Sequence, residues 1–159
     1  MEKIAEEARL QEEAYLARNA ERPEVQVTPN GLQYEIILET DGEKPQSDSI
    51  VRVKYEGLFR DGSLFDSTGD DEEGAFIPLE MVIPGWTEGL TMMGVGSKYR
   101  FFIPSSLAYG EDGIQSVIPP YATLIFTVEL LEIMTDEGAD FRSQFGYDNE
   151  DYEPETEEE

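Results

Sequence analysis

The chain of 159 residues contains no histidine and no cysteine. Without cysteine, disulfide bonds and thiolate chemistry are excluded. Without histidine, the chain lacks the side chain that most often acts as a general base near neutral pH and as a zinc ligand. Catalytic triads of the serine–histidine and cysteine–histidine types are therefore impossible. Any activity must come from carboxylates, tyrosines, backbone groups or the shape of an apolar cavity.

Basic residues are scarce, with 11 Lys and Arg against 36 Asp and Glu, and the net charge is −25. Residues 135–159 hold eleven acidic residues and a single basic one, Arg142, for a net charge of −10. A field of this sign repels nucleic acid and anionic membranes and favours basic client proteins. The acidic run at residues 70–73 lacks the spaced ligands and the glycine of an EF-hand loop, so we expect no metal site and no cofactor.

Long apolar runs are also absent. No stretch approaches the ~20 residues that a membrane-spanning helix needs. The first residues, MEKIAEEARLQEE, are acidic and lack the apolar core of a signal peptide. We therefore expect a soluble protein without a membrane span. The expected compartment is the cytoplasm if Met1 is the native start, and the periplasm if the chain is a mature form.

Hydrophobic residues make up 39% of the chain and aromatic residues 11%, which suffices for one core. Composition divides the chain into an N-terminal helical extension (1–24), a main domain (25–134) and an acidic tail (135–159). Residues 2–22 are rich in good helix formers and predict a helix with a thin apolar stripe. Such a helix could dock on the domain, end a longer dimerising helix, or be solvated and frayed. The tail predicts disorder, as a plain solvated segment or as one that docks a partner through its aromatic residues.

Between the two ends, apolar and polar residues alternate in the manner of half-buried strands. Strands are expected at residues 32–38, 51–55, 98–103 and 123–133, with an extended segment at 77–82. Pro84 favours a short helix over residues 84–93, because proline suits the first helical turn. No long helices separate the strands, which argues against a parallel α/β sheet. We predict an α+β fold, a curved antiparallel sheet or half-barrel wrapped around one short helix.

Five motifs combine aromatic or β-branched residues with turns. They are Tyr55-x-Gly57, Asp61-Gly62-x-x-Phe65-Asp66-Ser67, Val82-Ile83-x-Gly85-Trp86-x-x-Gly89, Ala108-Tyr109-Gly110, and Ile118-Pro119-Pro120-x-Ala122-Thr123-Leu124. Each alone is compatible with ordinary packing. In this order, over about Gly31 to Ile133, they resemble the FKBP-type immunophilin isomerases, the family that binds rapamycin. Tyr15-Leu16-Ala17-x-Asn19 is similar to the bacterial macrophage-infectivity-potentiator subgroup, but the longer dimerising region is missing or cut short, so we expect a monomer.

The resemblance implies a peptidyl-prolyl cis/trans isomerase, or rotamase, that accelerates X–Pro bond rotation in client proteins and assists their folding. By position, the Tyr109 hydroxyl would reach a substrate carbonyl, the Ile83 backbone N–H would hold a neighbouring carbonyl, and Asp66 would lie at the rim. The family's substrate pocket corresponds to Tyr55, Phe65, Val82, Ile83, Trp86, Val117, Ile118 and Phe126. The implied partners are proline-containing polypeptides and macrolide inhibitors such as rapamycin.

The chain departs from the family pattern in places that bear on macrolide affinity. Ile114 stands where some members carry a histidine, Ala75 matches an aromatic wall position, and the loop 69–74 offers no arginine to pair with Asp66. These departures motivate an alternative, a non-catalytic module that binds proline-containing segments in the same pocket and a basic partner through the tail. A third possibility is a holdase that works only through its acidic surface.

Overall fold

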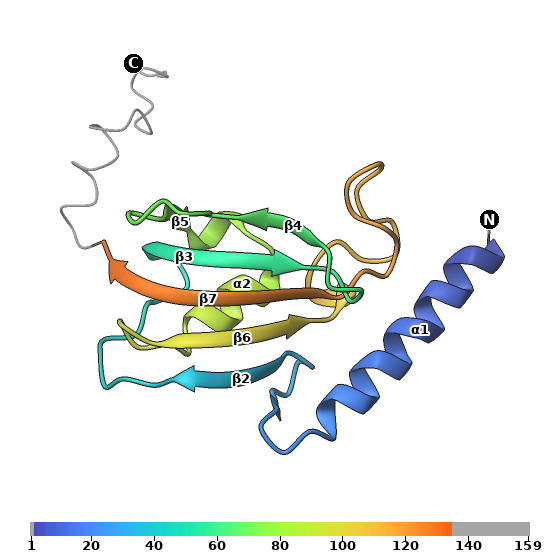
Figure 1. Cartoon of the computed structure of the whole chain (residues 1–159), viewed down its shortest axis with the longest axis horizontal. Helices are drawn as coiled ribbons and strands as arrows, with labels where there is room; N and C mark the ends of the chain where they lie inside the picture. Colours follow the sequence, from blue (N-terminus) through green and yellow to red (C-terminus); the bar gives the residue numbers. More distant parts are fainter. Residues whose placement is uncertain (1, 135–159) are drawn as a thin grey trace.

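The computed structural model describes residues 2–134, which form an open antiparallel sheet packed on a short helix (Figure 1). The strands are β1 (Gln26–Val27), β2 (Gln33–Leu38), β3 (Ile50–Leu58), β4 (Leu64–Ser67), β5 (Ala75–Pro78), β6 (Lys98–Ile103) and β7 (Leu124–Ile133). The helices are α1 (Glu2–Ala20) and α2 (Pro84–Leu90), with 3₁₀ turns η1 (Leu79–Met81) and η2 (Ser105–Leu107). The predicted α+β fold is confirmed, whereas the tail predicted to be disordered, 135–159, lies outside the described residues.

The sheet has seven strands in the order β1-β2-β6-β7-β3-β4, and β5 adds to β3 beside β4. The long β7 lies between β6 and β3, with Phe126 opposite Phe101 on one side and Gly57 on the other. Since successive side chains point to opposite faces of a strand, Phe126 joins the main core while Ile125 faces away from it. None of the helices in the described part is long and apolar enough to cross a bilayer.

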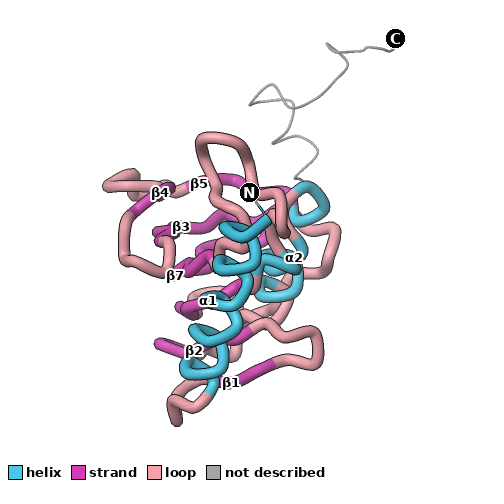
Figure 2. Tube along the Cα trace, turned by 90° about the vertical axis from the view of Figure 1, so that its right-hand side faces the viewer, coloured by secondary structure: helices cyan, strands magenta, loops and turns pink. Residues whose placement is uncertain are grey.

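The helix α2 packs against the main-core face of the sheet (Figures 1 and 2). Its start follows from Pro84 in the first turn, where the missing N–H has no helical partner to lose. Gly89 faces the sheet so closely that an added Cβ would lie 2.6 Å from the Phe101 Cε1 atom. This close approach buries Trp86 to 5% exposure and fixes its place under the sheet.

The helix α1 docks on the opposite face of the sheet. Tyr15 packs there against a small apolar cluster of Val25, Phe102 and Ile125. Of the three interpretations of the N-terminal helix, the structure shows docking, and the helix ends at Ala20, two residues earlier than predicted.

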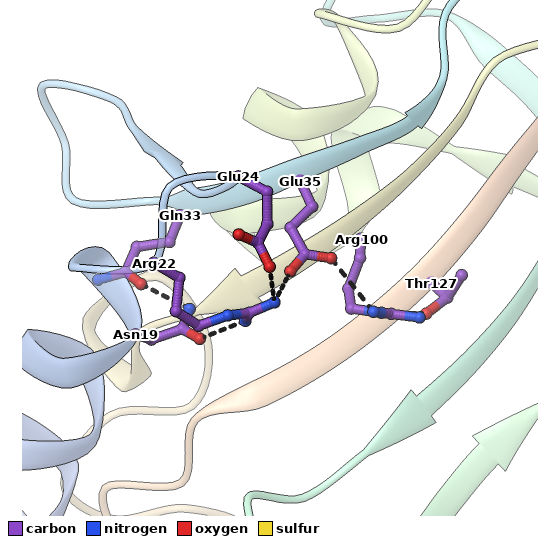
Figure 3. Close-up of polar contacts among 7 residues, drawn as sticks. All are labelled: Asn19, Arg22, Glu24, Gln33, Glu35, Arg100 and Thr127. Atoms are coloured by element: carbon purple, nitrogen blue, oxygen red, sulfur yellow. Dashed lines mark hydrogen bonds and ion pairs between the residues drawn. The ribbon is translucent and has the colours of Figure 1, made fainter.

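A polar cluster ties the C-terminal end of α1 to the sheet (Figure 3). Its members are Asn19, Arg22, Glu24, Gln33, Glu35, Arg100 and Thr127. The Asn19 side-chain amide donates to Gln33 Oε1 at 2.8 Å. Arg22 and Arg100 both form ion pairs with Glu35, whose side chain is only 9% exposed. A carboxylate this buried is stabilised by paired charges and hydrogen bonds, so the cluster fixes how α1 meets β2 and β6.

The same cluster explains why the prediction for β2 was wrong in part. The alternation over residues 32–38 predicts that Ile36 and Leu38 lie on the buried face, but these residues are 37% and 56% exposed. Gln33 and Glu35, on the face expected to be solvated, are buried instead. Their partners come from α1 and β6, so a strand pattern read locally cannot reveal that the polar face is covered.

The segment before α2 also differs from its prediction. Residues 77–82 were expected to be extended throughout, but Leu79–Met81 form a 3₁₀ turn. Leu79 is fully buried, and its N–H donates to the Ser49 carbonyl at 2.9 Å. The turn brings Val82 and Ile83 to the start of α2, which ends at Leu90 rather than at residue 93.

Candidate active site

A cavity of about 510 Å³ opens between the sheet, α2 and the loop that joins β6 to β7. Its lining consists of Tyr55, Phe65, Asp66, Ile77, Met81, Val82, Ile83, Trp86, Tyr109, Ile114, Val117, Ile118, Leu124 and Phe126. Every residue that the sequence predicted for the site lies in this lining, apart from Ala75, which was matched to a wall position. The structure therefore brings them together from β3, β4, β7, α2 and the loop, while their individual roles stay predictions.

Aromatic rings build the inner part of the cavity. The Trp86 ring lies edge-to-face with Tyr55 at a centroid distance of 5.3 Å and with Phe126 at 5.2 Å. Phe65 meets Phe126 in the same way at 5.5 Å. Edge-to-face contacts place the positive edge of one ring on the negative face of another. The result is a preformed apolar floor and wall that needs no rearrangement to receive a small ring.

Gly57 makes this arrangement possible from the neighbouring strand. It lies directly opposite Phe126 in the β3–β7 pairing. A Cβ at this position would lie 2.7 Å from Phe126 Cε1 and 3.0 Å from Phe65 Cζ. The glycine of the Tyr55-x-Gly57 motif therefore leaves the space in which the two phenylalanine rings meet.

Two polar hydrogens lie at the apolar wall without a partner in the described part of the chain. Ile83 caps α2, and its carbonyl accepts from the Trp86 and Thr87 N–H groups at 3.0 and 3.3 Å. The Ile83 N–H itself makes no hydrogen bond within residues 2–134, and neither does the Tyr109 hydroxyl. Tyr109 is 41% exposed. Both donors line the cavity and are free to hold carbonyl oxygens of a bound peptide.

Asp66 has a hydrogen-bond partner that the resemblance to the family did not suggest. The Tyr55 hydroxyl donates to Asp66 Oδ2 at 3.0 Å, and the Ser67 N–H donates to Oδ1 at 2.8 Å. The absence of an arginine in the loop 69–74 therefore does not leave Asp66 unpaired. Burial, followed by the charge of Asp66 and this hydrogen bond, raises the pKa of Tyr55 to about 12.

The raised pKa of Tyr55 predicts an alkaline loss of stability. Below pH 10 the phenol is neutral in both the folded and the unfolded chain, so the stabilisation is complete. Between its ordinary pKa of 10.0 and about 12 the unfolded chain loses this proton first, so the free energy of unfolding falls as the pH rises. We expect Tyr55→Phe to remove this part of the decline, measured as urea midpoints from pH 9 to pH 12.

The pH comparison uses the difference between the two curves, because burial also raises the pKa of Tyr15 and Tyr99, which are present in both proteins. Curves for the parent chain and Tyr55→Phe that run parallel throughout this range would contradict the assignment.

Four lining residues were not predicted as site residues. On β5, Ile77 lines the cavity, whereas Ala75, which was matched to a wall position, does not. Ile114, noted only as a departure from the family pattern, lines the mouth. Met81, which is 79% exposed, and Leu124 complete the lining. Ile77 lies before the 3₁₀ turn and Met81 is its last residue, and the sequence of this segment gave no sign that both would face the cavity.

Acidic side chains in the described part of the chain do not gather into a group of three or more that could hold a metal ion. The cavity is instead apolar, with one paired carboxylate and two free donors. Such a site can bind an uncharged ring and orient the amide groups beside it.

Comparisons with known proteins agree with the motifs. The model of the FKBP-type peptidyl-prolyl cis-trans isomerase family matches residues 41–131, and that of the domain amino terminal to FKBP-type peptidyl-prolyl isomerase matches residues 1–36. The FKBP-type peptidyl-prolyl cis-trans isomerase FkpA of Aeromonas hydrophila is 51% identical over 132 residues, 83% of this chain and 49% of that protein. The outer membrane protein MIP of Legionella longbeachae is 41% identical over 131 residues, 82% of this chain and 56% of that protein.

Among solved structures, a peptidyl-prolyl cis-trans isomerase from Pseudomonas syringae superimposes with a TM-score of 0.77. It is 32% identical, and the match covers 82% of this chain and 96% of that one. By contrast, the chain spans about half the length of the curated relatives named above.

Proposed function

Because the chain belongs to the FKBP-type peptidyl-prolyl cis-trans isomerase family, we propose that it accelerates the rotation of X–Pro bonds in polypeptide clients and so assists their folding. The observation that carries this proposal is the apolar cavity floored by Trp86, with free donors on Ile83 and Tyr109. A proline ring fits such a floor, and the carbonyls on either side of the ring need such donors.

Rotation about a peptide bond is slow because resonance opposes it, with a barrier of about 18–20 kcal/mol. For X–Pro the two planar forms differ by only ~0.5–1 kcal/mol, so unfolded chains populate both and exchange slowly enough to limit folding. No covalent bond forms or breaks in this reaction. The absence of histidine and cysteine is therefore no obstacle to catalysis.

Catalysis requires that the cavity bind the twisted amide better than either planar form. The twisted amide has lost resonance, so its charge separation is smaller and an apolar surface suits it better than water does. The Ile83 N–H and the Tyr109 hydroxyl would hold carbonyl oxygens in fixed positions while the bond turns. Because these donors are in place beforehand, little reorganisation is needed. Asp66 and its bound Tyr55 would form the polar rim beside the rotating bond.

The proposal is tested with a short Leu-Pro or Phe-Pro peptide in a protease-coupled assay, or by NMR exchange between its two isomers. We expect catalysed exchange. Binding of the peptide without any rate enhancement would overturn the isomerase proposal and favour the non-catalytic binding module. Client binding that disappears only when residues 135–159 are deleted would favour the acidic holdase.

Replacing Tyr109 with phenylalanine should lower kcat/KM without unfolding the protein. The hydroxyl makes no hydrogen bond within the described part of the chain, so its removal leaves no internal group unsatisfied. If it binds a carbonyl in the transition state, its loss costs about 1–3 kcal/mol of transition-state stabilisation, a fall in kcat/KM of roughly 5- to 150-fold. Tyr121→Phe is the control, because the Tyr121 hydroxyl bonds to Glu111 and lies outside the cavity lining. Equal activities of the two variants would contradict the role of Tyr109.

The partners are a further part of the proposal. The net charge of −25 supports basic clients, and weaker catalysis of basic substrates at high salt would follow.

The apolar lining supports macrolides such as rapamycin as competitors, which the same peptide assay tests. We propose a monomer, to be checked by mass measurement in solution. The compartment stays a prediction.

A further inference from the structure

Glu12 lies on α1, far from the cavity in sequence, and its carboxylate is buried. Glu12 as a whole is only 6% exposed. Oε2 accepts from the Ser105 N–H at 2.7 Å and from the Thr123 hydroxyl at 2.8 Å, and Oε1 accepts from the Ser105 hydroxyl at 2.7 Å. Among the described residues Glu12 forms no ion pair. A buried carboxylate that depends on three neutral donors needs all of them in place.

The three donors belong to the two ends of one loop. Ser105 opens η2 and is separated from β6 by Pro104 alone, and Thr123 directly precedes β7. Between them lies the loop that contributes Tyr109, Val117 and Ile118 to the cavity. A single side chain from α1 therefore holds both ends of the segment that forms one wall of the site.

Hydrogen bonds continue from Ser105 to the residues around Tyr109. The Ser105 carbonyl accepts from the Ala108 N–H and from the Gly110 N–H, both at 2.9 Å. The amides on either side of Tyr109 are thus bonded to the residue that Glu12 holds. Movement of Ser105 would be passed directly to the position of the Tyr109 hydroxyl.

The second end of the loop is held in the same way. The Arg60 guanidinium donates to the Tyr121 carbonyl at 3.0 Å and to the Thr123 hydroxyl oxygen at 3.4 Å. With its oxygen accepting from Arg60, the Thr123 hydroxyl directs its hydrogen to Glu12. The Tyr121 N–H closes the loop by donating to the Gly110 carbonyl at 3.0 Å.

We propose that Glu12 is a positioning residue, which couples the docked helix α1 to the Tyr109 loop and holds that loop in the geometry needed for catalysis. The proposal rests on the isomerase function for its kinetic consequence but not for its structural one. Glu12 touches no substrate and acts only through Ser105 and Thr123. The polar cluster around Arg22 anchors the end of α1, so the helix is fixed at two points and can transmit this constraint.

The test compares three variants. Glu12→Ala removes the acceptor, and we expect kcat/KM to fall about tenfold because misplacement of a positioning group is costly. Glu12→Gln is the conservative variant. Its amide oxygen can accept from the Ser105 N–H and the Thr123 hydroxyl while its NH₂ donates to the Ser105 hydroxyl, so activity should be largely restored. Glu13→Ala is the matched control, because the Glu13 side chain is 59% exposed and its ion pair within residues 2–134 is with Arg9.

A double-mutant cycle with Tyr109→Phe separates positioning from general destabilisation. All proteins are assayed at a temperature at which circular dichroism shows them folded. If Glu12 acts through Tyr109, the effect of Glu12→Ala shrinks when the hydroxyl is already absent. Independent effects that multiply in the double variant would overturn the proposal, as would a Glu12→Ala protein as active as Glu13→Ala.

Amide hydrogen exchange provides a readout that does not depend on activity. In Glu12→Ala the Ala108 and Gly110 amides should exchange more than tenfold faster relative to the amides of β3 and β7. An unchanged ratio would overturn the proposed coupling. If the unmodified chain proves inactive, the isomerase proposal fails while this exchange measurement still decides whether Glu12 holds the loop.

Discussion

Replacing Phe126 with alanine should cost about 3–5 kcal/mol of the free energy of unfolding, as is typical for removing a buried phenylalanine. The ring is 5% exposed and meets Trp86, Tyr55 and Phe65 edge-to-face. It lies opposite Gly57, so the residue paired with it on β3 has no side chain that could fill the space that the ring leaves. Urea unfolding measures the loss. We also expect kcat/KM to fall by roughly tenfold or more. The reason is that Trp86, which floors the cavity, and the wall residues Tyr55 and Phe65 all lose their contact with the Phe126 ring.

Phe102→Ala is the matched control for this prediction. Phe102 is 3% exposed and belongs to the same sheet, but it packs on the opposite face with Val25 and Ile125. Its replacement should destabilise the fold to a similar extent while leaving kcat/KM of the folded molecules unchanged. If both variants lost activity in proportion to stability alone, the special position of Phe126 in the cavity would be refuted.

Gly89→Val should be nearly as damaging, through the opposite mechanism of too much volume. A Cβ at this position would lie 2.6 Å from Phe101 Cε1, and Phe101 is itself 1% exposed and unable to move aside. We expect a loss of about 3 kcal/mol, at the upper end of the usual cost of overpacking. Because Ile83 caps α2 and Trp86 lies on it, outward displacement of the helix should also reduce the affinity for a proline peptide, measured by titration.

Glu88→Val controls for the β-branched residue in a helix. It is the neighbouring position on α2, is only half-buried, and does not line the cavity. We expect Glu88→Val to lose little stability and to keep its affinity for the peptide. Gly89→Ala should fall between the two. A Gly89→Val protein as stable as Glu88→Val would show that the helix and sheet can separate without penalty.

Much of the fold was predictable because it depends on local patterns. The alternation around Val51–Tyr55 predicted β3, Pro84 predicted the start of α2, and the apolar run near the end of the main domain predicted β7 within one residue. The motifs also identified most of the cavity lining, because each motif places an apolar side chain next to a turn. Such signals are contained within a few neighbouring residues.

The features that escaped prediction all depend on partners distant in sequence. Glu35 reads as a solvated strand residue until Arg22 and Arg100 surround it. Glu12 reads as one more exposed acid on a charged helix, yet its partners Ser105 and Thr123 lie far along the chain. The hydrogen bond from Tyr55 to Asp66 likewise joins two strands. In a chain with 36 acidic residues, nothing local distinguishes the few that are buried.

The central place of β7 also bears on how the chain acquires its structure during synthesis. This strand is the last of the described ones, yet it lies between β6 and β3 and pairs with residues as distant as Val51, opposite Ile133. Until residues 124–133 leave the ribosome, the edges of β3 and β6 that face each other have no partner. Folds dominated by such distant pairings form slowly, and unpaired edges invite aggregation. The nascent chain should therefore need protection at this stage, and ribosome-bound chains that stop before residue 124 should be sensitive to proteases.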